Sequence, residues 1–206
     1  MSSRFHRNVR PQSATSKGER IQRLKSSDLD DSQRSLYDAI VGGARVGTQT
    51  IVPLVDSDGS LEGPFGPLLY APRTGHFVQS LGATLRTQSS LDDRCRELCT
   101  LRSAVSISCQ YEIDAHMRLS EHAGVSADEI ACLVAGSLPP TLNATENSCI
   151  EVVDFSMAGE TFDEDDFNRV LAELGETMFV EVILLVGYYR MIGGLLNNFA
   201  ITEVSA

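Results

Sequence analysis

Apolar residues recur every three or four positions along most of this chain, which is the spacing of one face of a helix. Only the short segment 50–55 has the residue types of a strand. The pattern predicts helices over residues 28–41, from Pro72 to near 89, and over 92–105, 109–123, 126–136, 144–158, 161–175 and 176–199. We therefore predict an all-α fold, arranged as a helical bundle.

Several helix ends are marked by capping residues. Ser126 followed by Glu129 is a capping box, and Thr161 followed by Glu164 has the same form. Ser27 or Asp28 is suited to cap the first helix, whereas Gly175 is suited to end the seventh. These local signals set the expected boundaries of the predicted helices.

Two segments depart from the pattern of ordinary amphipathic helices. Residues 51–67 are rich in Gly, Pro, Ser and Asp, so we expect a long ordered loop of the kind that often lines a site. Residues 176–199 are apolar nearly all round, although Glu181 and Arg190 argue against a membrane span. Such a helix belongs in a core or a subunit interface, and we predict a homo-oligomer.

Charge divides the chain into an arm and a body. The 206 residues carry a formal net charge of -11, and 42% of them are hydrophobic, enough for a core. Residues 1–25 contain seven basic residues and one acidic residue, so the remainder has a net charge of -17. We predict a flexible basic arm at 1–27 and a single domain at 28–206. The acidic body argues against nucleic acid as a partner.

The cysteines and histidines favour a reducing compartment and no metal. The five cysteines form no C-x-x-C pair, and the four histidines are far apart. We therefore expect a cytoplasmic protein without a metal or cofactor. The Arg- and Ser-rich arm has the composition of a mitochondrial targeting segment, so a mitochondrial location is the alternative.

The stretch 96–116 carries the candidate chemistry. In a helix from Cys109 onward, Cys109, Glu112 and His116 share one stripe, and Glu97 can reach them from the preceding helix. An imidazole beside a carboxylate is suited to general acid–base catalysis near neutral pH. The alternative is an ordinary helix-surface pair worth about 0.2–0.5 kcal/mol.

Cys109 has two interpretations. In the first turn of a helix its thiolate would be stabilised by the helix dipole, so the residue could line a site. Cysteine is also often a small buried apolar residue. The sequence leaves both open.

The same stretch resembles the carboxymuconolactone decarboxylase family, within the alkyl hydroperoxidase D-like superfamily. The resemblance rests on Arg96-Glu97-Leu98, on Tyr111-Glu112-Ile113-Asp114-Ala115-His116 and on Ala123-Gly124-Val125-Ser126, with weaker support from Gly187-Tyr188-Tyr189. It implies an alkyl hydroperoxidase D-like helical bundle that assembles as a trimer or hexamer. The peroxidase branch of this superfamily needs a second cysteine where this chain has Glu112, so the sequence resembles the decarboxylase branch.

The resemblance implies a cofactor-free lyase or isomerase acting on an enolisable lactone, aromatic or polyketide-like small molecule. His116, Glu112 and Glu97 are the expected catalytic residues, and Cys109, Tyr111 and Arg102 the expected substrate-binding residues. The alternative is a non-catalytic oligomeric scaffold or small-ligand-binding protein, with the catalytic trio exposed or beside no cavity. A thiol peroxidase is the third hypothesis and would require Cys109 to work with Cys99, Cys132 or an outside thiol.

Overall fold

The computed structural model describes residues 18–43 and 51–204, and their regular structure is helical. One isolated bridge, between Val55 and Leu61, is the only extended pairing in these two ranges. The elements are the 3-10 helix η1 (Ser26–Asp28), α1 (Asp31–Val41), α2 (Phe65–Leu68), α3 (Pro72–Thr87), α4 (Asp93–Ser106), α5 (Gln110–His122), α6 (Ala127–Val134), α7 (Ala144–Ala158) and α8 (Glu164–Phe199). The predicted all-α class is confirmed.

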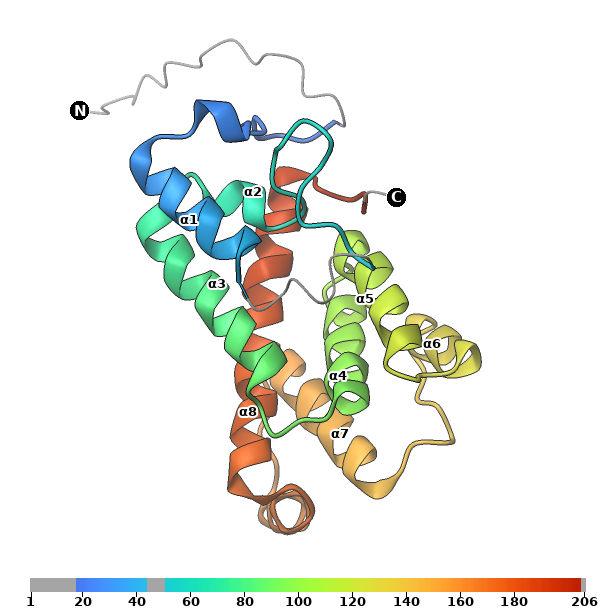
Figure 1. Cartoon of the computed structure of the whole chain (residues 1–206). Coiled ribbons are helices and arrows are strands. Elements are labelled where there is room, and N and C mark those ends of the chain that lie inside the picture. The colour runs from blue at the N-terminus through green and yellow to red at the C-terminus, as the bar shows by residue number, and fades with distance from the viewer. Residues whose placement is uncertain (1–17, 44–50, 205–206) are drawn as a thin grey trace, which may run out of the picture.

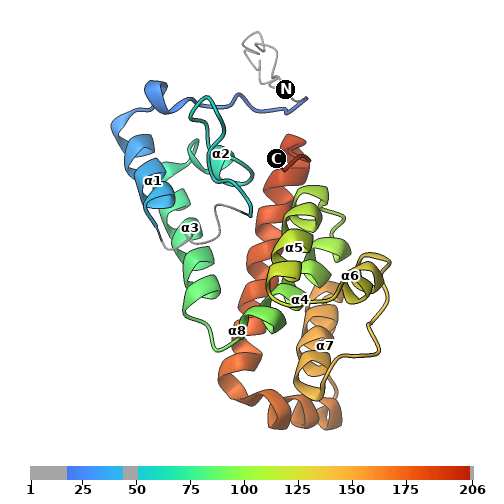
Figure 2. The same cartoon turned by 45° about the vertical axis from the view of Figure 1, so that its right-hand side comes forward.

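Helix α8 forms the axis of the molecule (Figure 1). Helices α1 and α3 lie on one side of it, and α4, α5, α6 and α7 lie on the other, as Figure 2 shows from a second direction. The main apolar core fills the space where α4, α7 and α8 meet, and includes Cys99, Val153 and Leu185. No helix within the described ranges has the length and apolar character needed to cross a membrane.

The helix ends follow the local capping chemistry. Ser126 accepts a hydrogen bond from the backbone of Glu129, whose side chain bonds back, so the predicted capping box of α6 is confirmed. Two predicted starts are wrong. Helix α1 begins at Asp31 under an Asp30 cap, and α8 begins at Glu164, because Asp163 accepts the hydrogen bond from Asp166 and Thr161 lies outside the helix.

Gly175 breaks α8 into the two helices that the sequence predicts. Its backbone has φ 68° and ψ 166°, a conformation outside the helix that glycine adopts at little cost. The segment before Gly175 turns across the base of the molecule, and the segment after it becomes the axis (Figure 2).

The apolar residues that recur at helical spacing along α3 do not all face the core. Leu85 is buried, but Phe77 is 79% exposed and Leu81 is 38% exposed. The buried side of α3 instead includes Gly75 and Gly82. At Gly75 a Cβ would collide with Leu36 of α1, so glycine allows these two helices to approach closely.

The predicted arm is only partly described. Residues 1–17 lie outside the described residues. From Gly18 to Lys25 the chain runs beside the loop that precedes α2, and Arg23 forms ion pairs with Asp56 at 3.0 Å and Glu62 at 3.1 Å. Residues 18–25 are therefore attached to the domain.

Candidate functional site

The site is built where α5 folds back against α4. Ser108, between the two helices, has φ 51°, and Cys109 is the N-cap of α5. The helix predicted to start at Cys109 therefore begins one residue later, at Gln110. This turn brings the side chains of α5 against Glu97 of α4.

His116 lies between two carboxylates. Its Nδ1 is 2.6 Å from Oε2 of Glu97, and its Nε2 is 3.2 Å from Oε2 of Glu112. All three residues are buried, with exposed fractions of 4% or less. The two glutamates and the histidine that the sequence singles out thus form one contiguous group, and this geometry differs from a solvated helix-surface pair.

The surroundings favour an imidazolium. Burial by itself lowers the pKa of His116, but Tyr189, Glu97 and Glu112 outweigh burial and raise that pKa to about 10. Burial also acts to raise the pKa of Glu97, yet His116, Arg86 and Arg96 lower it to about 2. At neutral pH the imidazolium therefore donates both N–H groups to carboxylates, and His116 holds a proton.

Arg86 of α3 completes the group from the opposite side. Its Nη1 donates to Oε1 of Glu97 at 3.0 Å, and its guanidinium lies beside Tyr189 of α8. Glu97 therefore accepts from both His116 and Arg86. The sequence prediction named Arg102 and missed Arg86, because the distance of Arg86 from Glu97 depends on how α3 packs.

A cavity of about 70 Å³ borders His116 and Glu112. Its walls are mainly apolar and aromatic, and they come from the loop before α2 and from α2, α3, α5 and α8. The lining residues are Val52, Pro53, Leu54, Pro64, Phe65, Arg86, Tyr111, Glu112, Ala115, His116, Leu119, Tyr188, Tyr189 and Ile192. Glu97 lies behind His116 and outside the lining, which makes it a positioning residue.

The segment predicted as a loop over residues 51–67 lines this cavity, but the prediction is wrong for its last residues, because α2 begins at Phe65. Gly63 has φ 57°, and a Cβ there would collide with the ring and hydroxyl of Tyr111. A glycine is therefore required for the loop to approach Tyr111. The lining includes Tyr111, in keeping with its predicted place at the site, whereas sequence reasoning missed Tyr188 and Tyr189, which come from the distant α8.

Two predicted substrate-binding residues are not among the lining residues. Cys109 is fully buried in the main core, and burial raises the pKa of its thiol to about 11, so the packing interpretation holds. Arg102 forms hydrogen bonds of 2.7 and 3.0 Å with the two carboxylate oxygens of Asp154 on α7. The predicted roles of both residues need correction, because helix packing turns them toward other partners.

The described residues contain one group with the composition of a metal site. The sulfur atoms of Cys95, Cys99 and Cys149 lie within 4.8 Å of one another. The sequence did not reveal this group, since Cys149 is fifty positions from Cys99 and comes from another helix. In the His116 group, by contrast, both ring nitrogens face carboxylates, which leaves no free nitrogen for a metal.

Comparison with known proteins identifies solved structures of similar fold and one matching family model. A search of curated proteins gives no match. An uncharacterized peroxidase-related protein from Ralstonia eutropha JMP134 has 14% identity and a TM-score of 0.69, with 91% of this chain and 93% of that chain covered. A variant of the debrominase Bmp8, in complex with 2,3,4-tribromopyrrole, has 10% identity and a TM-score of 0.67, with 95% of both chains covered.

A third solved structure is that of ATU0492 from Agrobacterium tumefaciens, a protein of unknown function described as a "putative antioxidant defence protein AhpD". It has 18% identity and a TM-score of 0.61, with 70% of this chain and 99% of that chain covered. Residues 72–154, which include Glu97, Glu112 and His116, match the sequence model of the Carboxymuconolactone decarboxylase family. Residues 72–154 are therefore similar to the carboxymuconolactone decarboxylase family, and the chain has the AhpD-like helical fold.

Proposed function

We propose that this protein is a cofactor-independent lyase or isomerase that transfers protons to and from an enolisable small molecule. The observation that carries the proposal is His116, held as an imidazolium between Glu97 and Glu112 at the wall of a mainly apolar cavity. A proton donor and a carboxylate base side by side are the minimum for moving a proton between two carbon atoms.

Each polar residue has a role that follows from its position. Glu112 lies on the cavity wall and acts as the base that removes a proton from carbon. His116 returns a proton, and its positive charge stabilises the enolate that forms in between. Glu97 orients the imidazole, and Arg86 holds Glu97 in turn.

Two reactions use these roles with balanced protons. In isomerisation, Glu112 takes a proton from one carbon and the bond electrons form an enolate. His116 then gives its Nε2 proton to another carbon, and Glu112 passes its proton to His116. In decarboxylation, the carbon–carbon bond electrons remain on the substrate as carbon dioxide leaves. His116 protonates the resulting dienolate, and a proton from water restores the imidazolium.

The cavity supports a small planar substrate. Four aromatic residues line it, namely Phe65, Tyr111, Tyr188 and Tyr189, and the arginine in its lining is already paired with Glu97. Burial raises the pKa of Tyr111, so its phenol stays neutral and can donate a hydrogen bond to a substrate oxygen. A debrominase of the same fold binds 2,3,4-tribromopyrrole, also a small ring. We therefore propose a lactone or aromatic substrate of low negative charge.

Exchange of substrate hydrogen with deuterated water tests this function without requiring the full reaction. The purified protein is incubated with a panel of enolisable lactones and cyclic ketones, and deuterium incorporation is followed by NMR. We expect exchange at one carbon and a loss of about 10²–10⁴-fold in His116→Ala. Exchange at the wild-type rate in a folded His116→Ala would contradict the proposal.

The alternative hypotheses receive less support. A non-catalytic scaffold predicts an exposed trio or one without a cavity, whereas the trio here is buried and two of its members border a cavity. A thiol peroxidase needs a reactive thiolate, and Cys109 is buried with a raised pKa.

We also propose that the chain self-associates through α8. An apolar stripe on this helix reaches solvent, with Val180 52%, Ile183 44%, Leu184 50% and Met191 41% exposed. Their spacing places them along one face, and a contiguous apolar surface favours a protein partner. Light scattering at micromolar concentration should give an oligomer for the wild type and a monomer for Val180→Glu/Leu184→Glu. A monomeric wild type would refute the idea.

A further inference from the structure

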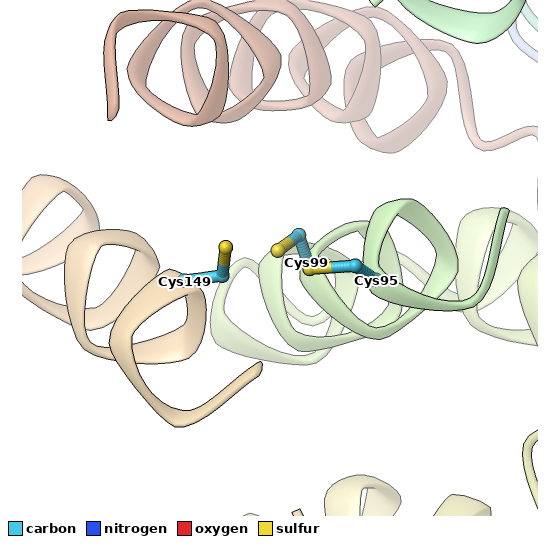
Figure 3. A group of neighbouring side chains, drawn as sticks. All are labelled: Cys95, Cys99 and Cys149. Atoms are coloured by element: carbon cyan, nitrogen blue, oxygen red, sulfur yellow. The ribbon is translucent and has the colours of Figure 1, made fainter. Parts of the chain in front are cut away.

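A second cluster of reactive side chains lies on the opposite face of α4 from Glu97. Cys95 and Cys99 are four residues apart, so their side chains leave α4 in nearly the same direction, about 180° around the helix from Glu97. Cys149 of α7 meets them across the helix interface (Figure 3). All three thiols are free and buried. Helix α4 thus separates the thiol cluster from the candidate active site.

The donor atoms of the cluster are all sulfur. The three Sγ atoms lie within 4.8 Å of one another, and Sδ of Met178 on α8 is 3.9 Å from Sγ of Cys149. A metal bonded to three sulfurs at about 2.3 Å holds those sulfurs about 4 Å apart, so only a small contraction is needed. Soft thiolate and thioether donors without nitrogen or oxygen select soft cations such as Cu(I).

We propose that Cys95, Cys99 and Cys149 form a buried binding site for a soft monovalent cation, Cu(I), with the Met178 thioether as a weaker neighbour. Binding forms three copper–sulfur bonds and releases thiol protons to solvent. No oxidation or reduction is involved. The site is chemically independent of the proton-transfer function, because its residues do not line the cavity and lie on the opposite face of α4 from Glu97.

Packing alone does not account for the cluster. A small apolar residue fills a core position without needing sulfur, and single buried cysteines are common for that reason. Here three of the five cysteines of the chain converge from two helices. Met178, whose sulfur is 3.9 Å from Sγ of Cys149, comes from a third helix.

The test is a competition for Cu(I) by the full chain, reduced and kept anaerobic. Cu(I) is added as its acetonitrile complex in the presence of bicinchoninate. The colour of the copper–bicinchoninate complex reports the Cu(I) that the protein has not bound. We expect the protein to withdraw one equivalent. Cys149→Ala should bind at least about tenfold more weakly, a loss of about 1.4 kcal/mol. Cys132→Ala, which removes a thiol outside the cluster, is the matched control and should bind as the wild type does.

X-ray absorption of the copper-loaded wild type gives an answer that does not depend on how well a variant folds. A shell of sulfur alone at about 2.3 Å supports the site. A shell containing nitrogen or oxygen overturns it. In the competition, failure to withdraw Cu(I), or a difference between Cys149→Ala and Cys132→Ala below about tenfold, would overturn it as well.

Discussion

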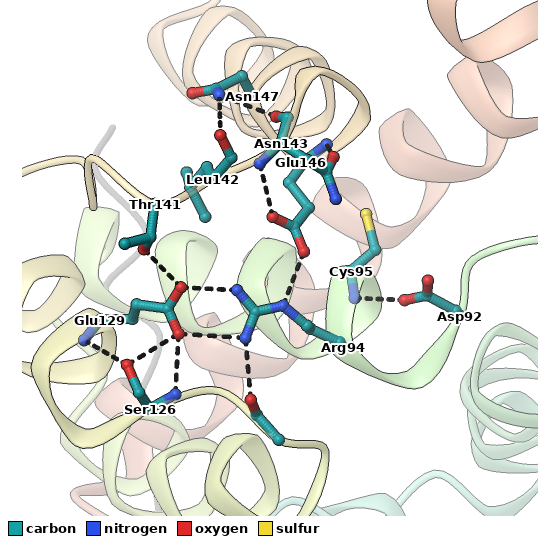
Figure 4. A network of polar contacts seen from close by, with 11 residues as sticks. Asp92, Arg94, Cys95, Ser126, Glu129, Thr141, Leu142, Asn143, Glu146 and Asn147 are labelled. Atoms are coloured by element: carbon teal, nitrogen blue, oxygen red, sulfur yellow. Dashed lines mark hydrogen bonds and ion pairs between the residues drawn. The ribbon is translucent and has the colours of Figure 1, made fainter.

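Two charge networks in this protein have the same arrangement in different surroundings. In one, His116 lies between Glu97 and Glu112. In the other, Arg94 on α4 joins Glu129 of α6 to Glu146 of α7, with 2.7 Å contacts to both (Figure 4). Each network has one cation between two carboxylates, and each ties α4 to other parts of the chain.

The two networks differ in the hydrogen bonds of their glutamates, in whether the cation can lose its proton, and in whether a glutamate borders the cavity. In the Arg94 network, Glu129 also accepts hydrogen bonds from Ser126 and Thr141, and Glu146 accepts one from the backbone of Asn143. Neither glutamate borders the cavity, and guanidinium stays charged at any pH a protein tolerates. In the His116 network the cation can lose its proton, and Glu112 faces the cavity. An ion pair can take part in proton transfer only where one of its groups can titrate and borders a cavity that admits a substrate.

The largest expected difference between the networks is in the rate of proton transfer. Glu112→Gln keeps the size of the side chain but removes the base, so we expect deuterium exchange to fall about 10²–10⁴-fold. Glu129→Gln is the matched change in the Arg94 network and should leave the rate nearly unchanged. Equal exchange rates in the two variants would contradict the proposal that Glu112, and not Glu129, takes part in proton transfer.

The second difference is in how stability depends on pH. The pKa of His116 rises from 6.5 to about 10 on folding, so its contribution is fully present below about pH 6.5 and is lost as pH rises through about 10. We expect the free energy of unfolding to fall by a few kcal/mol over that range, and less so in His116→Gln. Urea unfolding at a series of pH values measures this. The same alkaline loss in both proteins would contradict the assignment.

The third and smallest expected effect is the loss in free energy of unfolding when the cation of the Arg94 network is removed. Arg94→Leu leaves Glu129 and Glu146 without their partner, and Arg94 holds the pKa of Glu129 well below its usual range. Because the Arg94 side chain is 27% exposed, we expect a loss of about 2–3 kcal/mol, less than the ~3–5 kcal/mol of a fully buried pair. Thermal unfolding measures the loss, and exchange activity below the transition should persist.

Local signals predicted most of the helices because a helix is specified by its own residues. The capping box at Ser126 and the break at Gly175 are both as predicted, since each depends on contacts within a few positions. The i,i+4 pairing of Glu112 and His116 also needs only one helix. The predicted start of α8 is wrong because Asp163, and not Thr161, accepts the hydrogen bond from the backbone N–H of Asp166.

The sequence by itself determined the all-helical class and the stripe of candidate residues on α5, because both follow from periodicity. Only the tertiary structure decided which distant residues join them. It brought Arg86 to Glu97, turned Arg102 toward Asp154, and added Cys149 to Cys95 and Cys99. These contacts depend on how helices pack against one another, and the rotation of one helix against the next is set by the whole core.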